Sequence, residues 1–144
     1  MAELSGDQLI ERMNATMPPT GRLLGQKIIE ADPDAGTVVI EYEAKPEFCN
    51  PMGSVQGGFV SAMLDDAAAI ACVIASRGKV GVPTLEMKVS FLRAARPGKL
   101  RAEGKVMKMG RSIAFLESHL YDGDGKLLAH STQTAKPIPF ERKD

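Results

Sequence analysis

Two adjacent carboxylates, Asp65 and Asp66, stand in a segment that otherwise has the composition of a protein core. The segment is residues 50–72, NPMGSVQGGFVSAMLDDAAAIAC, and from residue 57 to 75 its only other polar side chain is Ser61. Neighbouring residues on a helix point about 100° apart, so the two aspartates cannot share one environment. They could both lie on a solvated face, but such faces usually carry interspersed charge of both signs. We therefore expect at least one aspartate to face a pocket or subunit interface. A carboxylate in such a place is a candidate general base or nucleophile.

Two glycines precede the same segment and could supply the complementary part of a reaction site. Gly57 and Gly58 stand where the helical pattern begins. The first N–H groups of a helix have no partner within it, and they carry partial positive charge. Such groups can hold a developing oxyanion. The alternative is that the two glycines only allow a tight turn into the helix.

The elements around this segment predict an α+β fold. One long helix is expected at 59–76, and a short amphipathic helix at 6–16. Alternating apolar residues and turn signals predict strands at 23–31, 37–44, 85–91, 99–108, 112–121 and 126–135, with a charged tail at 137–144. A single long helix has no helical neighbours to bury it, so it must lie on the concave face of a curved antiparallel sheet of five to six strands. The open edges of that sheet favour edge-to-edge dimerisation.

Length and composition set outer limits on the function. The 144 residues predict a single domain, 1–144, and lysine plus arginine balance aspartate plus glutamate at 18 each. That balance predicts neither nucleic acid nor an anionic membrane as a partner. The apolar run at 67–75 is too short to cross a bilayer, and the N-terminus has no leader pattern, so we expect a cytoplasmic protein. Cys49 and Cys72 match no metal-ligand spacing and predict no disulfide framework.

The order of residues around the helix resembles a known family. Asn50, Gln56, Gly57, Gly58 and Asp65 follow one another as in the active-site segment of hotdog-fold acyl-CoA thioesterases of the phenylacetate-pathway type. Downstream, PTLEMKVSFLRAARPG resembles the next strand and turn of that family, and MGRSIAFLESHLYDGDGKLLAHSTQT resembles its last two strands. The resemblance extends over about residues 36–136 and implies a hotdog fold.

The resemblance also implies roles for individual residues. Asp65 would be the catalytic carboxylate, as general base or nucleophile, and the Gly57 N–H would polarise the thioester carbonyl. Asn50 would help to position the water or the carboxylate, and Thr84 of the partner subunit would orient the nucleophile. Asp66 matches no role in the family and is expected to be structural.

Gly58, Arg93, Arg111 and Ser112 are predicted to bind coenzyme A, which is part of the substrate. Arginine forks suit phosphate oxygens, and the resemblance implies that residues near Arg111 and Ser112 lie beside the nucleotide; the alternative for the arginines is a solvated basic rim. No metal or redox cofactor is expected. The family usually has histidine where this chain has Gln56, and a glutamine can donate a hydrogen bond but cannot exchange a proton near neutral pH. Self-association as a dimer or a dimer of dimers (a homotetramer) is implied, with two protomers building each site.

Two alternatives remain open at this point. The first is a non-catalytic acyl-thioester binding or regulatory module, which Gln56 makes plausible. The second is a hotdog dehydratase or hydratase, which would use a catalytic histidine. His119 and His130 lie far from the glycines in sequence and are assigned no chemistry. The acyl group is not predicted.

Overall fold

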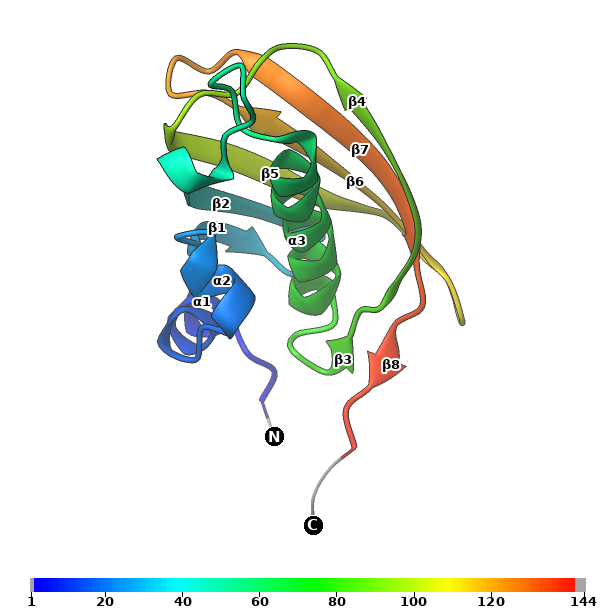
Figure 1. The fold of residues 1–144 in the computed structure, drawn as a ribbon. Helices are drawn as coiled ribbons and strands as arrows, with labels where there is room; N and C mark the ends of the chain where they lie inside the picture. Colours follow the sequence, from blue (N-terminus) through cyan, green and yellow to red (C-terminus); the bar gives the residue numbers. More distant parts are fainter. Residues whose placement is uncertain (1, 142–144) are drawn as a thin grey trace.

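The computed structural model describes residues 2–141 and shows one long helix lying across a curved sheet (Figure 1). The helical segments in chain order are α1 (Gly6–Ala15), α2 (Pro19–Leu23), the 3-10 turn η1 (Pro46–Phe48) and α3 (Gly57–Ala75). The strands are β1 (Lys27–Asp32), β2 (Thr37–Ala44), β3 (Val80–Gly81), β4 (Thr84–Phe91), β5 (Gly98–Met109), β6 (Ala114–Tyr121), β7 (Leu127–Ala135) and β8 (Ile138–Pro139).

The main sheet has six antiparallel strands in the order β1-β2-β5-β6-β7-β4. Helix α3 lies on its concave face and contacts every strand of the sheet. This arrangement confirms the predicted hotdog architecture. A second, two-stranded sheet of β3 and β8 lies near the C-terminal end of α3.

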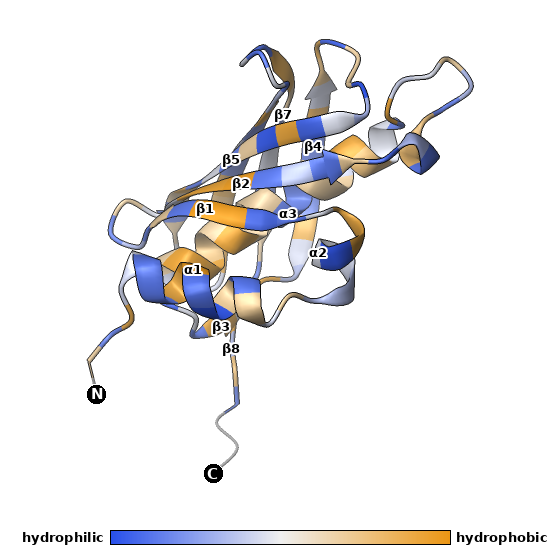
Figure 2. Ribbon diagram, turned by 90° about the vertical axis from the view of Figure 1, so that its left-hand side faces the viewer, coloured by the Kyte–Doolittle hydropathy of each residue, from blue (hydrophilic) through white to orange (hydrophobic). Residues whose placement is uncertain are grey.

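Helix α3 packs against the sheet through small residues on both sides. A Cβ added to Gly104 on β5 would lie 2.1 Å from the carbonyl oxygen of Ala67, so only glycine lets the helix come this close. The buried side chains of α3 face the sheet, and Figure 2 shows this helix as predominantly apolar: Val60, Met63, Leu64, Ala67, Ala68, Ile70, Ala71, Cys72 and Ile74. By length and composition alone the helix could cross a membrane, because its 19 residues exceed the apolar run at 67–75 considered in the sequence. Half of this apolar stretch of α3 is buried inside the protein, as expected for a core helix.

The two edges of the six-stranded sheet differ in how their backbone groups are satisfied. On the β1 edge, the side chain of Asn14 in α1 donates to the Ile28 carbonyl at 2.9 Å and accepts from the Ile28 N–H at 3.0 Å. Strand β4 forms the other edge, and in the described chain its only neighbour in the sheet is β7. Exposed apolar side chains lie at its end, since Phe91 and Leu92 are each 57% exposed. The β4 edge is therefore the one open to a further strand.

Three sequence predictions need correction in detail. The first strand begins at Lys27 rather than residue 23, because Pro18 and Pro19 initiate the short helix α2 and Gly25 then turns the chain at φ 61°. The long helix begins at Gly57, two residues before the predicted start. The predicted charged tail, 137–144, contains β8 at its beginning, and its last residues, 142–144, lie outside the described residues.

Candidate active site

The carboxylate of Asp65 is held by two side chains from the sheet. Thr84 Oγ1 at the start of β4 donates to Asp65 Oδ1 at 2.6 Å. Gln133 Nε2 on β7 donates to the same oxygen at 3.0 Å. Hydrogen bonds to an ionised acceptor are short and strong, so the pair fixes the side chain of Asp65 in one orientation.

The second oxygen of Asp65 is left open by this arrangement. In the described part of the chain no hydrogen bond falls on Oδ2. Only two buried side-chain oxygen or nitrogen atoms among residues 2–141 lack a partner, Gln26 Oε1 and Gln133 Oε1, so Asp65 Oδ2 is not sealed from solvent. One oxygen is thus anchored while the other can accept a proton or attack an electrophile.

Thr84 reaches Asp65 within one chain, which corrects the expected geometry. We expected Thr84 of the partner subunit to orient the nucleophile, but the 2.6 Å hydrogen bond joins two residues of the same protomer. Strand β4 runs beside β7, with Thr84 opposite Ala135, and this register sets the threonine beside α3. Thr84 therefore contacts Asp65, the residue that it was predicted to orient.

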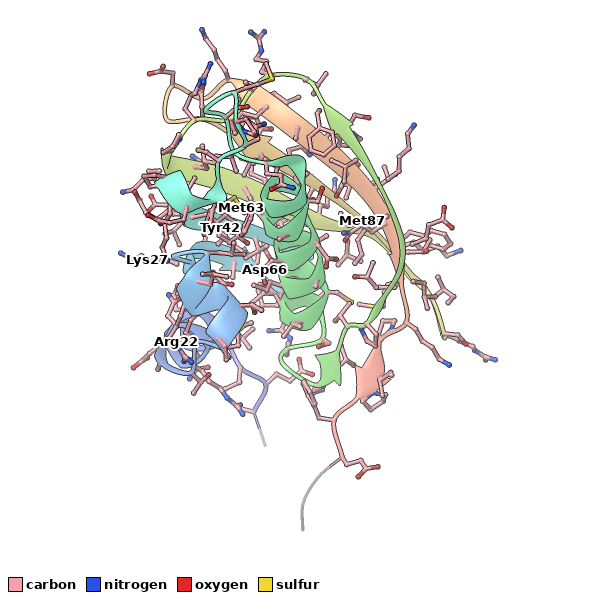
Figure 3. The ribbon with its side chains drawn as sticks, in the orientation of Figure 1. Arg22, Lys27, Tyr42, Met63, Asp66 and Met87 are labelled. Atoms are coloured by element: carbon pink, nitrogen blue, oxygen red, sulfur yellow. The ribbon has the colours of Figure 1, made fainter. Side chains whose placement is uncertain are left out.

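Asp66 has a separate environment on a different side of α3. Tyr42 on β2 donates its hydroxyl to Asp66 Oδ2 at 2.6 Å. In Figure 3, Tyr42 and Asp66 lie on the side of α3 toward β1 and β2, whereas Met87 lies on the side toward β4. Burial raises the pKa of Asp66 to about 6, the Tyr42 hydrogen bond opposes this rise, and the nearby Asp65 charge adds to it. Burial and the adjacent Asp66 also raise the pKa of Tyr42, so the phenol remains a proton donor.

The N-terminus of α3 presents free backbone donors, as the sequence predicted. Gln56 is its N-cap and makes no capping side-chain hydrogen bond, so its exposed amide is available. Within residues 2–141 the N–H groups of Gly57 and Gly58 donate to no backbone acceptor outside the helix, as expected for the first helical turn. The ring of Phe91 lies against Gly57, where an added Cβ would be 3.2 Å from the ring. A hollow of about 360 Å³ opens beside this glycine, between the helix start and the segment after β4.

The loop before α3 is fixed by its own hydrogen bonds and by packing. Asn50 Oδ1 accepts from the N–H groups of Met52 and Ser54 at 3.0 and 3.3 Å, and Asn50 Nδ2 donates to Ser54 Oγ at 3.1 Å. The rings of Phe48 and Phe59 stack with centroids 4.2 Å apart. Asn50 thus belongs to the group around the helix start and shapes its loop rather than contacting Asp65 of its own chain.

A single chain keeps the two halves of the predicted site apart. Gly57 and Asp65 are separated along the axis of α3 by about 12 Å, at about 1.5 Å per residue. A reacting carbonyl must lie about 3 Å from both its oxyanion donor and its attacking group. One chain therefore provides a carboxylate half (Asp65, Thr84, Gln133) and a donor half (Asn50, Gln56, Gly57) that cannot act together on one thioester.

The residues predicted to bind coenzyme A lie at two ends of the molecule. Gly58 and Arg93 lie near the N-terminal end of α3, and Arg93 is exposed. Arg111 and Ser112 are exposed in the turn between β5 and β6, the yellow hairpin of Figure 1, which projects away from that helix end. The described chain does not bring these two pairs together.

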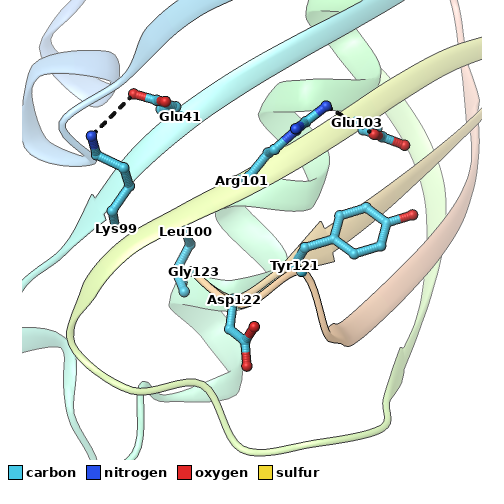
Figure 4. A pocket seen from close by; sticks show the side chains of 9 residues that line it. Glu41, Lys99, Leu100, Arg101, Glu103, Tyr121, Asp122 and Gly123 are labelled. Atoms are coloured by element: carbon cyan, nitrogen blue, oxygen red, sulfur yellow. Dashed lines mark hydrogen bonds and ion pairs between the residues drawn. The ribbon is translucent and has the colours of Figure 1, made fainter.

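Another hollow lies on the convex face of the sheet, away from Asp65. It measures about 420 Å³ and is lined by residues of β2, β5 and the β6–β7 hairpin (Figure 4). Four of its charged side chains are paired within the wall, since Lys99 lies 3.5 Å from Glu41 and Arg101 lies 3.3 Å from Glu103. Among residues 2–141 no group of three or more His, Cys, Asp or Glu side chains could hold a metal ion.

Sequence reasoning did not identify Gln133 as a residue of the site. On β7 it occupies an inward position, and with Ser118 and Ser131 it is one of three buried polar side chains in the described chain. The sequence did contain a signal: Gln133 is a polar residue at a position that the alternation along the strand assigns to the core. Its partner could not be known without the register of β7 against α3.

The architecture is that of the hotdog-fold thioesterases. The sequence profile of the thioesterase superfamily matches residues 52–129, which contain the helix and both halves of the site except Asn50 and Gln133. The chain belongs to the thioesterase superfamily.

Individual relatives agree with this assignment. The chain is 28% identical to human acyl-coenzyme A thioesterase 13 over 116 residues, which is 78% of this chain and 81% of that protein. A phenylacetic acid degradation-related protein from Ralstonia eutropha JMP134 superposes with a TM-score of 0.82 at 34% identity, covering 89% of this chain and 98% of that chain. The PaaI protein of Escherichia coli shares the fold with a TM-score of 0.78 at 21% identity, covering 90% and 91% of the two chains.

Proposed function

We propose that the protein hydrolyses acyl-CoA thioesters at a site shared by two protomers. The observation that carries the proposal is the state of Asp65, whose Oδ1 is anchored by Thr84 and Gln133 while Oδ2 is open. Acyl-CoA as the substrate is supported by the relatives that carry this name. Membership of the thioesterase superfamily supports hydrolysis as the reaction.

The second protomer is required because the two halves of the site lie about 12 Å apart along one helix. The open edge of β4 is the natural place for it, since pairing of two β4 strands would satisfy the unpaired backbone groups and cover Phe91 and Leu92. In such a dimer the carboxylate half of one protomer faces the donor half of the other. Two sites result, each with one Asp65 and one helix N-terminus.

The reaction then proceeds with the residues in defined roles. The Gly57 N–H binds the thioester carbonyl oxygen and stabilises the negative charge that develops on it. Asp65 takes one proton from a water molecule as the water oxygen bonds to the carbonyl carbon. The carbon–sulfur bond of the tetrahedral intermediate breaks, the acid is released, and the thiolate leaves and takes up the proton held by Asp65. Alternatively, Asp65 Oδ2 attacks the carbonyl carbon, the carbon–sulfur bond breaks to release the thiolate, and water hydrolyses the resulting anhydride to the free acid and Asp65.

Gln56 fits this scheme as a donor without proton exchange. Its exposed amide at the N-cap of α3 can donate to the carbonyl or sulfur of the substrate. A coenzyme A thiolate is a fairly good leaving group, so protonation by a histidine is not essential. The geometry disfavours a dehydratase, because His119 and His130 face each other on the strand positions opposite to the inward Ser118 and Ser131, with ring centroids 4.6 Å apart.

The test is thiol release from a panel of aliphatic and aryl acyl-CoA thioesters by the wild type, by Asp65→Asn and by Asp124→Asn. Asp124 lies exposed in the β6–β7 turn and serves as a matched control for the loss of one negative charge. We expect Asp65→Asn to lose at least about a hundredfold in kcat, as for a removed catalytic base, and Asp124→Asn to match the wild type. If no thioester releases thiol, yet one raises the melting temperature, the protein is a binding module rather than an enzyme.

A further inference from the structure

Three small residues lie side by side on the face of the sheet that carries α3. Gly104 on β5 pairs with Ser118 on β6, and Ser118 pairs with Ser131 on β7, so the three form one row across the sheet. Both serines are fully buried. The row lets the helix come close, because a Cβ at Gly104 would collide with the carbonyl oxygen of Ala67. We call these three residues the seat of α3.

The two serine hydroxyls of the seat form a chain of hydrogen bonds that ends on the helix backbone. Ser118 Oγ donates to the carbonyl oxygen of Leu64 at 2.8 Å. A carbonyl oxygen can only accept, so the single hydroxyl hydrogen of Ser118 is used in this bond. Ser131 is therefore the donor in the 2.6 Å contact between the two hydroxyls. The chain has one direction, from Ser131 through Ser118 to Leu64.

The carbonyl group that the seat holds belongs to the residue immediately before Asp65. Most of the contact between α3 and the sheet is apolar, and apolar burial has no preferred direction. A hydrogen bond requires a particular distance and angle. The bond from Ser118 to Leu64 therefore restricts both the height of α3 above the sheet and its rotation at the turn that carries Asp65.

Asp65 depends on this restriction because both donors to its carboxylate come from the sheet. Thr84 Oγ1 and Gln133 Nε2 reach Asp65 Oδ1 at 2.6 and 3.0 Å. Such bonds extend to only about 3.2 Å, so a small displacement of the helix would break at least one of them. Ser131 and Gln133 are neighbouring inward positions of β7, so one strand both supports the helix and holds its carboxylate.

We propose that Ser118 and Ser131 are positioning residues: they fix α3 on the sheet at the turn that carries Asp65, within reach of the two donors to its carboxylate. The inference rests on the proposed hydrolytic function of Asp65. Neither serine touches the substrate or exchanges a proton. Alanine is no larger than serine, so the close approach of the helix does not by itself require the two hydroxyls.

The kinetic test removes the hydroxyls without adding volume. Ser118→Ala is expected to lower kcat about tenfold, because a catalytic group displaced by about 1 Å can lose up to about a hundredfold. KM should stay within about twofold. Ser131→Ala should lose less, about threefold, because Ser118 keeps its bond to Leu64. Thr132→Val, at an exposed position of the same strand, is the control and should retain wild-type kinetics. A wild-type kcat in both alanine variants would overturn the inference while leaving the hydrolytic function intact.

A double-mutant cycle with Thr84→Val separates positioning from a general loss of packing. If Ser118 acts through the donors to Asp65, its effect must shrink once one of those donors is gone. Ser118→Ala in the Thr84→Val background is therefore expected to lower kcat by about threefold or less. A full tenfold loss in that background would contradict the proposed route. Urea unfolding of each variant establishes that the rates are compared among folded proteins.

A structural measurement decides the same point without activity. In crystal structures of the wild type and Ser118→Ala, the distance from Thr84 Oγ1 to Asp65 Oδ1 should increase from 2.6 Å to beyond about 3.2 Å in the variant. An unchanged distance would refute the positioning role. If the wild type hydrolyses no thioester, the proposed function fails, and the two structures still show whether the serines position Asp65.

Discussion

The half-buried carboxylate of Asp66 makes the stability of this protein depend on pH in a direction that can be calculated. Its pKa is about 6 against an ordinary value of 3.8, with burial as the main cause. The folded state therefore binds a proton more tightly than the unfolded state. Between pH 3.8 and about 6 the folded state holds more protons, so the free energy of unfolding falls as the pH rises.

The size of the effect follows from the shift. About two pKa units, at about 1.4 kcal/mol each, correspond to roughly 3 kcal/mol, and some screening by solvent reduces this because Asp66 is only partly buried. The contribution of Asp66 is fully present below pH 4 and is lost above about pH 6. Asp66→Asn removes the titration and keeps an oxygen that can accept from Tyr42. We therefore compare the free energies of unfolding of Asp66→Asn and the wild type at two pH values. Between pH 4 and pH 8 the difference should change by about 1–3 kcal/mol in favour of Asp66→Asn.

Urea unfolding at pH 4, 6 and 8, at one protomer concentration, measures this difference. A fixed concentration matters because the stability of an oligomer depends on it. Subtracting the two curves at each pH cancels the titration of all other groups. Asp124→Asn, at an exposed turn, should run parallel to the wild type at every pH. A constant difference between wild type and Asp66→Asn over this range would refute the reasoning.

Three further substitutions follow from particular contacts. Thr84→Val removes the 2.6 Å donor to the Asp65 carboxylate and, on the proposed function, should lower kcat about tenfold, whereas Thr84→Ser should keep the wild-type rate. Equal rates for both variants in a thiol-release assay would contradict this role of Thr84. Gly57→Ala places a methyl group 3.2 Å from the Phe91 ring and should lower kcat/KM about tenfold. The double variant Gly57→Ala, Phe91→Leu should recover part of this loss. A wild-type rate in Gly57→Ala alone would show that the methyl group does not crowd the Phe91 ring. Gly104→Ala places a Cβ 2.1 Å from the Ala67 carbonyl oxygen and should lower the free energy of unfolding, measured in urea, by about 3 kcal/mol or more. Gly123→Ala, where the added Cβ has its nearest neighbour 3.9 Å away, should change it little. Similar values for the two variants would contradict the close packing of α3 on β5.

The fold could be predicted because its main signals are local. The alternation along β5, β6 and β7 and the single long apolar helix leave few other ways to bury the core. The short helix α2 was not predicted, although Pro19 is a residue type favoured in the first turn of a helix. Strand β8 was missed because two residues carry no periodic signal.

The site could be predicted only as far as its residues share one segment. Asp65 and Gly57 lie on one helix, so spacing and resemblance were enough to predict a chemical role for them. Gln133 and Thr84 reach Asp65 through the register of β7 and β4 against α3, which no local pattern encodes. For the same reason Thr84 was assigned to the wrong protomer.

The separation of the two halves on α3 has a genetic consequence. Two inactive variants, Asp65→Asn and one with a bulky residue at Gly57, should restore activity when they are mixed and allowed to exchange subunits. If the proposed dimer forms, one site of the mixed dimer combines both defects, while the other receives an intact Asp65 from one chain and an intact Gly57 from the other. Two loss-of-function alleles of this protein would therefore complement each other inside one dimer, because each chain supplies the half of the site that is defective in the other.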